Sequence, residues 1–102
     1  MQEEPIITKM ADDILNMCEP RKIILFSKKY NMSDELTSFK LCVIVPDNVD
    51  LTELECKIYL ELDCENPFNV ILYKASEWEH ICVDDESFAN KIIKNGVVLY
   101  ES

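Results

Sequence analysis

The sequence predicts one α/β domain over residues 1–102, built as a small mixed sheet of three to four strands with helices packed on it. Short continuous apolar runs, typical of buried strands, alternate with segments whose apolar residues recur every three or four positions. Apolar residues make up 48% of the 102 residues, which is enough for one hydrophobic core. No linker, repeat or low-complexity segment divides the chain.

The first predicted element is a helix from about Pro5 to Glu19. Its apolar residues recur at steps of three and four and therefore share one face: Ile7, Met10, Ile14 and Met17. Pro5 suits a first helical turn, and Pro20 stops the helix because proline has no backbone N–H to donate. Residues 22–26 form a continuous apolar run, which predicts a buried strand.

Residues 27–38 are polar, and a short helix is expected near Ser33–Leu36. A second buried strand is expected over Phe39–Val45, closed by Pro46. Asp50 then caps a helix, since its carboxylate can accept a hydrogen bond from the first turn. The buried stripe of this helix is expected to consist of Leu51, Leu54, Ile58 and Leu62.

The last third of the chain predicts a strand at Phe68–Tyr73 and a short helix capped by Ser76. The acidic run Asp84–Glu86 suits the start of a further helix. The inner face of that helix is expected to consist of Phe88, Ile92 and Ile93. Gly96 is expected to end it in a left-handed conformation, before a final strand at Val97–Tyr100.

The net charge of −10 disfavours several classes of partner. Nucleic acids and anionic membranes are held through Lys and Arg, so neither is expected. No apolar run reaches the roughly 18 residues that a membrane span needs. The five cysteines are odd in number, none has C-x-x-C spacing, and the acidic start resembles no secretory signal. We therefore expect a cytoplasmic protein with reduced thiols.

Short motifs follow one another in a definite order between residues 6 and 101. An apolar strand at 22–26 is followed by a serine and two lysines, a second apolar strand spans Leu41–Val45, and a third ends at Tyr73. The C-terminal third contains Glu77-Trp78, Glu86-Ser87-Phe88-Ala89, Ile92, Gly96 and Val98-Leu99-Tyr100-Glu101. In this order and spacing the chain resembles a minimal nucleotidyltransferase of the DNA polymerase β superfamily.

The resemblance implies a nucleotidyltransferase-like fold and a defined site. In the family a Gly-Ser turn follows the first strand, an Asp-x-Asp pair opens the second, and a third Asp lies on the third strand. The three carboxylates hold magnesium, which bridges the nucleotide phosphates. The matching positions in this chain are Ser27 at the turn, Ser38 and Lys40 at the pair, and Asn69 on the third strand.

These positions predict a degenerate site. Three aspartates would carry a charge of −3, whereas Ser38, Lys40 and Asn69 together carry +1, a difference of four charges. Magnesium is bound through carboxylate and phosphate oxygens, so no metal site and no catalytic residue are expected. The turn also lacks glycine, since Gly96 is the only glycine in the chain.

Two further groups of residues are candidate binding sites. Lys28, Lys29 and Lys40 form the one basic cluster, which is a solvated loop, a residual anion or nucleotide site, or a contact for an acidic partner. Trp78 either packs in the core or anchors a protein partner, because tryptophan is enriched at interface hot spots.

The leading hypothesis is a catalytically inactive nucleotidyltransferase-like domain that binds a protein partner or regulates one, without a cofactor. Family members often work beside a small helical protein, so such a partner or self-association is expected. The first alternative is an active enzyme using magnesium and ATP, with carboxylates recruited from Asp34, Glu35 or Asp63. The second is an unrelated small acidic α/β interaction protein.

Overall fold

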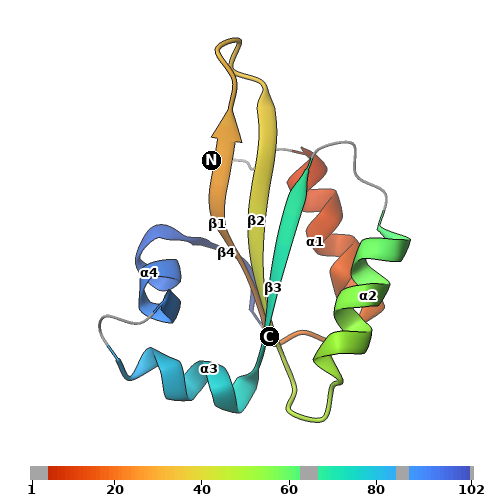
Figure 1. Ribbon diagram of the computed structural model, residues 1–102, viewed down its shortest axis with the longest axis vertical. Helices are drawn as coiled ribbons and strands as arrows, with labels where there is room; N and C mark the ends of the chain where they lie inside the picture. Colours follow the sequence, from red (N-terminus) through yellow and green to blue (C-terminus); the bar gives the residue numbers. More distant parts are fainter. Residues whose placement is uncertain (1–4, 63–66, 85–87, 102) are drawn as a thin grey trace.

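One mixed sheet organises the part of the chain that the structure, a computed structural model, describes: residues 5–62, 67–84 and 88–101 (Figure 1). Its four strands in these ranges are β1 (Lys22–Tyr30), β2 (Leu36–Val45), β3 (Phe68–Lys74) and β4 (Val97–Glu101). They lie in the order β3-β2-β1-β4. The β2–β3 pair is parallel, and β1 is antiparallel to both β2 and β4. The predicted α/β class is confirmed.

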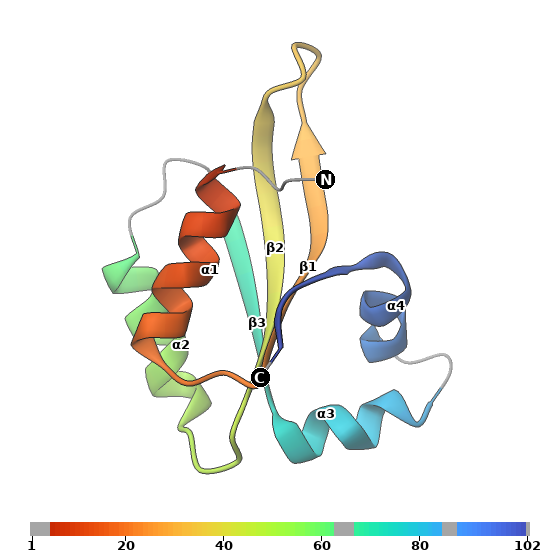
Figure 2. The same ribbon diagram turned by 180° about the vertical axis from the view of Figure 1, so that it is seen from behind.

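Helices cover both faces of the sheet (Figures 1 and 2). The helices are α1 (Pro5–Met17), α2 (Leu51–Glu61), α3 (Ala75–Cys82) and α4 (Phe88–Asn95). α1 and α2 pack on one face, and α3 and α4 on the other. This arrangement explains the continuous apolar runs, because a strand buried on both faces has no position left for a polar residue.

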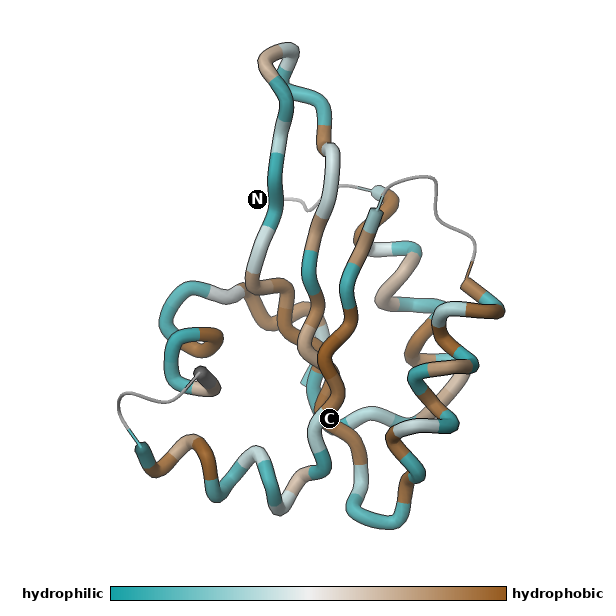
Figure 3. The backbone as a smooth tube through the Cα atoms, viewed as in Figure 1, coloured by the Kyte–Doolittle hydropathy of each residue, from teal (hydrophilic) through white to brown (hydrophobic). Residues whose placement is uncertain are grey.

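The pleat of β2 divides the core into two clusters. Phe39, Leu41 and Val43 point toward α1 and α2 and join the larger cluster. Cys42 and Ile44 point the other way and join the smaller cluster with α3 and α4. All five are at most 3% exposed, so β2 is the centre of the molecule. In Figure 3 the hydrophobic colour accordingly follows the part of the sheet that lies between the helices.

A hairpin arm replaces the short helix expected near Ser33–Leu36, and that prediction is wrong. The Asn31 carboxamide oxygen accepts hydrogen bonds from the backbone N–H groups of Ser33 (2.8 Å) and Glu35 (3.0 Å). Asp34 adopts a positive φ of 60° in the same turn. Asparagine competes with helix formation by such local bonds. Both strands therefore run on to the turn, and the arm projects beyond the helices (Figure 1).

The start of α2 is confirmed, whereas the cap predicted for α3 is wrong. The Asp50 carboxylate accepts a hydrogen bond from the Glu53 N–H at 3.1 Å and so caps α2. α3 begins at Ala75, before the expected cap at Ser76. The Glu77 carboxylate instead accepts a hydrogen bond from the Lys74 N–H at 3.2 Å. A carboxylate in this position also complements the helix dipole.

The inner face of α4 differs from the prediction. Ile92 is buried as expected, but Ile93 is 47% exposed, and Ala89 takes the inner position. Ala89 precedes Ile92 by three residues and so shares its face. The Phe88 side chain and residues 85–87, with the acidic residues Asp85 and Glu86, lie outside what the structure describes.

Gly96 joins α4 to β4 without a positive φ, so its predicted left-handed conformation is wrong. Its N–H donates a hydrogen bond to the Ile92 carbonyl oxygen at 2.7 Å. A Cβ on residue 96 would lie 2.5 Å from that oxygen and 2.6 Å from Cγ2 of Ile24. Because glycine has no side chain, the C-terminal end of α4 can pack directly on Ile24 of β1.

Substitution Gly96→Ala is expected to lower the free energy of unfolding by about 1–3 kcal/mol, because the new methyl group would force Ile24 and the Ile92 backbone apart. Urea denaturation monitored by circular dichroism measures the change. The exposed Lys94→Ala variant, two residues away, is the control and should stay within about 0.5 kcal/mol of wild type. Equal stability of both variants would contradict the steric role of Gly96.

Candidate functional site

Ser27, Lys40 and Asn69 lie side by side on three neighbouring strands, and we call them the polar row. The sheet register pairs Ser27 of β1 with Lys40 of β2, and Lys40 with Asn69 of β3. Adjacent strands are about 4.8 Å apart, so the row spans about 10 Å of sheet. A register shift places Ser27 here, because Phe26 is an extra residue between the paired positions Leu25 and Ser27.

The polar row faces the side of the sheet that carries α3 and α4. Lys40 alternates with Phe39 and Leu41, which point to the opposite face. Directly paired residues share a face, so Ser27 and Asn69 point to the same side as Lys40. Ser27 and Lys40 are half-buried and Asn69 is exposed, so solvent reaches the row.

Ser38 and Lys29 extend the polar row along the hairpin. They pair with each other, and Ser38 lies two residues before Lys40 and therefore on the same face. The sheet thus gathers all four positions that the resemblance assigned to the site: Ser27, Ser38, Lys40 and Asn69. Together these side chains offer two hydroxyls, one ammonium and one amide, which do not match the carboxylate ligands that magnesium prefers.

The pleat divides the predicted lysine cluster. Lys29 and Lys40 share the face of the polar row, whereas Lys28 pairs with Phe39 and points toward the α1 and α2 side. An anion bound at the polar row would therefore lie on the same face as Lys29 and Lys40, but not Lys28. Ammonium and hydroxyl groups donate hydrogen bonds, so this face suits an anion better than a cation.

The carboxylates considered for an alternative metal site lie elsewhere. Asp34 and Glu35 are exposed in the turn at the tip of the hairpin arm, beyond the Lys29–Ser38 pair. Asp63 lies outside the described residues. Within residues 5–62, 67–84 and 88–101, no three His, Cys, Asp or Glu side chains are grouped so that they could hold a metal ion.

Trp78 lies in the smaller core cluster and is 7% exposed. Its ring centroid is 5.5 Å from that of Tyr73, with the two rings tilted by 50°. The side chain therefore packs α3 onto the sheet, which is the core role that the sequence left open beside partner contact. His80, two residues further along α3, is exposed.

One cysteine, Cys42, is buried in the core, and two others, Cys18 and Cys82, are half-buried. Burial raises the pKa of Cys42 to about 12, with a smaller contribution from the nearby Cys82. Burial also raises the pKa values of Cys18 and Cys82. Since the thiolate is the reactive form, a raised pKa makes these three thiols less reactive at neutral pH than an unperturbed cysteine.

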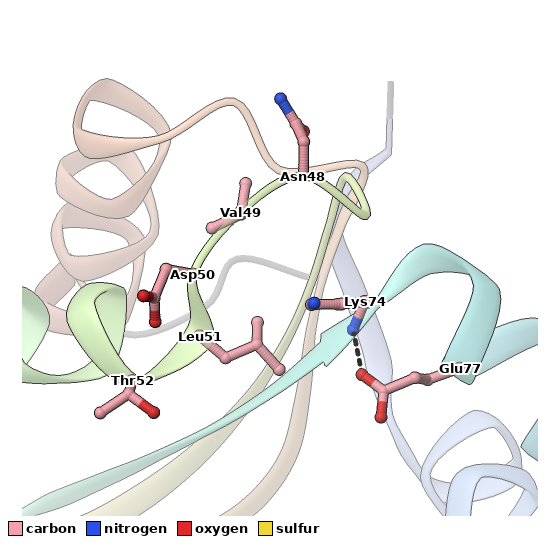
Figure 4. A pocket seen from close by; sticks show the side chains of 7 residues that line it. All are labelled: Asn48, Val49, Asp50, Leu51, Thr52, Lys74 and Glu77. Carbon is pink, nitrogen blue, oxygen red and sulfur yellow. Dashed lines mark hydrogen bonds between the residues drawn. The ribbon is translucent and has the colours of Figure 1, made fainter.

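A hollow of about 750 Å³ lies at the carboxyl ends of β2 and β3 (Figure 4). It forms because β2 continues into α2 on one face of the sheet while β3 continues into α3 on the other. Such points of divergence are common ligand sites in α/β proteins. The residues that line it are Asn48, Val49, Asp50, Leu51, Thr52, Lys74 and Glu77. No residue motif in the sequence predicts this hollow, although two strands that are each followed directly by a helix could have indicated it.

Asp47 joins the two sides of this divergence. Its carboxylate accepts a hydrogen bond from the Ser76 N–H at 2.9 Å, across 29 residues of sequence. Hydrogen bonds from the Ser76 backbone and hydroxyl lower the pKa of Asp47, with smaller contributions from Lys74 and Arg21. This hydrogen bond connects the loop before α2 to the first turn of α3.

Substitution Asp47→Ala is expected to lower the melting temperature at neutral pH. Because the pKa of Asp47 is lower in the folded state, its stabilising effect is complete above the ordinary value of 3.8 and is lost as the pH falls through the lowered pKa. The difference in melting temperature between wild type and variant should therefore shrink below about pH 4. Differential scanning calorimetry across pH measures it, with Asn48→Ala as the neighbouring exposed control. A difference independent of pH would contradict the role of the charge.

Comparison of the chain with protein-family models, with curated proteins and with solved structures gave no match. Among the described helices, none has the length and apolar character needed to cross a membrane.

Proposed function

We propose that this chain is a nucleotidyltransferase-like domain that does not transfer nucleotides and that acts in the cytoplasm by binding a protein partner. The polar row is the observation that carries the proposal. At the positions where the resemblance requires three acids, Ser38, Lys40 and Asn69 come together on one face of the sheet.

Lys40 is the decisive member of the polar row because it is central and positively charged. Its neighbours across both strand pairs, Ser27 and Asn69, are neutral. The Lys40 ammonium group carries a positive charge, so it would repel a divalent cation placed beside it. A magnesium–nucleotide complex would therefore find no carboxylate ligands for its metal at the positions where the family has them.

The order of the strands meets one requirement of the resemblance on which the proposal depends. The matching positions can form one site only if the three strands that carry them are neighbours, and β3, β2 and β1 are adjacent in the sheet. The hairpin arm departs from the family pattern, which places a short basic helix between the first two strands. This departure removes a helix N-terminus, the element that would otherwise bind phosphate.

A protein partner is supported by apolar side chains on the surface. The large hydrophobic residues exposed among the described ranges are Tyr30, Met32, Tyr59, Leu60, Val83, Ile93, Val97 and Val98. Of these residues, Val97 and Val98 are neighbours on β4, and exposed apolar groups that lie together mark interaction sites. The net charge of −10 favours a protein over a nucleic acid as the partner.

Calorimetric titration with magnesium and ATP tests the loss of catalysis. The wild-type chain is expected to show no magnesium-dependent affinity for ATP. The triple variant Ser38→Asp, Lys40→Asp, Asn69→Asp restores three carboxylates and is expected to gain magnesium affinity by at least about tenfold, since acidic oxygens are the ligands that this ion prefers.

The control is a triple variant with the same charge change of −4 at scattered exposed sites: Thr8→Asp, Asn16→Asp and Lys94→Asp. It should bind magnesium no better than wild type. Magnesium-dependent ATP binding by the unmodified chain, accompanied by nucleotide transfer to a protein, would refute the proposal and favour the active enzyme.

A further inference from the structure

Five polar side chains on one face of the sheet have hydrogen-bonding groups without a partner in the described chain. They are the polar row and the two residues that extend it, and we call them the donor face: Ser27, Lys29, Ser38, Lys40 and Asn69. Within residues 5–62, 67–84 and 88–101, the two ammonium groups form no ion pair, and the hydroxyls and the carboxamide form no hydrogen bond. The donor face can therefore satisfy these groups through water or through a binding partner.

A partner can reach the donor face because the hairpin arm projects beyond the helices (Figure 1). No described helix covers this part of the sheet on the side that carries α3 and α4 (Figures 1 and 2). In Figure 3, β1 changes from hydrophobic to hydrophilic colours where it leaves the helices. Lys29 and Asn69 are exposed, and the other three side chains are half-buried.

The donor face belongs to a basic segment of an acidic chain. Residues 22–45, which form β1, the turn and β2, contain four lysines and two acids and so carry a net charge of +2. The rest of the chain therefore carries −12. Both acids of this segment, Asp34 and Glu35, lie in the turn at the tip of the arm. A carboxylate is thus attracted to the donor face and repelled by the acidic remainder of the surface.

The two lysines of the donor face match the spacing of side chains in an extended peptide. Lys29 lies opposite Ser38, and Lys40 follows Ser38 by two residues, so the two lysines are diagonal neighbours. Such neighbours are about 7–8 Å apart. Alternate side chains of an extended chain point the same way and are about 6.6 Å apart. Two carboxylates at alternate positions of a peptide can therefore each reach one lysine.

We propose that the donor face binds an extended acidic segment of a protein partner, with acidic residues two positions apart. Each carboxylate accepts a charge-assisted hydrogen bond from one ammonium group, and Ser27, Ser38 and Asn69 supply further donors. A nucleic acid fits less well, because its phosphates would continue from the donor face onto acidic surface. The inference rests on the proposed function and names the chemistry of the partner.

Titration of the ¹⁵N-labelled full chain with short peptides, followed by nuclear magnetic resonance, tests this inference. The probe is Thr-Glu-Thr-Glu-Thr, blocked at both ends, which places two carboxylates on one side of an extended chain. The control peptide, Thr-Thr-Glu-Glu-Thr, has the same composition, but its adjacent carboxylates point to opposite sides. We expect saturable shifts of the Lys29, Ser38 and Lys40 amides, and a dissociation constant at least about threefold lower for the probe than for the control peptide.

Three single variants of the chain give a second readout with the same probe. Lys29→Gln and Lys40→Gln are each expected to raise its dissociation constant at least about threefold, because each removes one ion pair. Lys28→Gln is the matched control, since it makes the same substitution next to Lys29 but on the opposite face. It should change the constant by less than about 1.5-fold, because salt screens a charge that makes no direct contact. Circular dichroism checks that each variant is folded.

Three results would overturn the inference. The first is the absence of saturable shifts on the donor face at any concentration of the probe. The second is equal binding of the two peptides or an equal effect of Lys28→Gln and Lys29→Gln, since general charge attraction would then explain the binding. The third is inorganic phosphate that binds the donor face as tightly as the probe, because a single anion would then suffice.

The magnesium–ATP titration separates this inference from the proposed function. A chain that binds neither the probe nor magnesium–ATP would remove the acidic segment as partner and leave the loss of catalysis standing. A chain that binds the probe and also binds ATP in a magnesium-dependent manner would keep the donor face as a binding site and refute the proposed function.

Discussion

Ladder hydrogen bonds across β1, β2 and β3 align Ser27, Lys40 and Asn69 on one face of the sheet. The alignment combines an antiparallel pair, a parallel pair and one extra residue at Phe26. A shift of one residue in any of these strands would turn its side chains to the opposite face. The chemistry of the polar row is thus a consequence of strand register, and register in turn is held by the core residues of β2, which are buried on both sides.

The helices protect this register from both faces and leave one edge open. α1 and α2 pack on the larger core cluster, and α2 closes the β3 edge through Tyr59. The Trp78 side chain of α3 packs against the sheet, and the Asp47 carboxylate accepts a hydrogen bond from the first turn of the same helix. Gly96 lets α4 end against β1, after which β4 takes the remaining edge. Among the residues that the structure describes, no hydrogen bond joins the outer side of β4 to the rest of the chain.

The sequence predicted those elements whose cause is local. Buried strands and the cap at Asp50 follow from apolar runs and a single carboxylate near a helix start. The hairpin turn was missed because Asn31 makes local hydrogen bonds that polarity alone does not reveal. The role of Gly96 depends on Ile24, 72 residues earlier in the chain. The resemblance identifies the four positions of the candidate site, but the place of Ser27 beside Lys40 depends on the bulge at Phe26, which no residue pattern indicated.

The central claim is that the face carrying Lys40 holds no divalent cation. Nuclear magnetic resonance of the ¹⁵N-labelled chain during titration with Mn²⁺ tests it most directly, because a bound paramagnetic ion broadens the amide signals around it. We expect no saturable broadening at Ser27, Lys40 and Asn69, in the presence or absence of ATP. Saturable broadening centred on these three amides would show that a metal binds beside the ammonium group and would contradict the account.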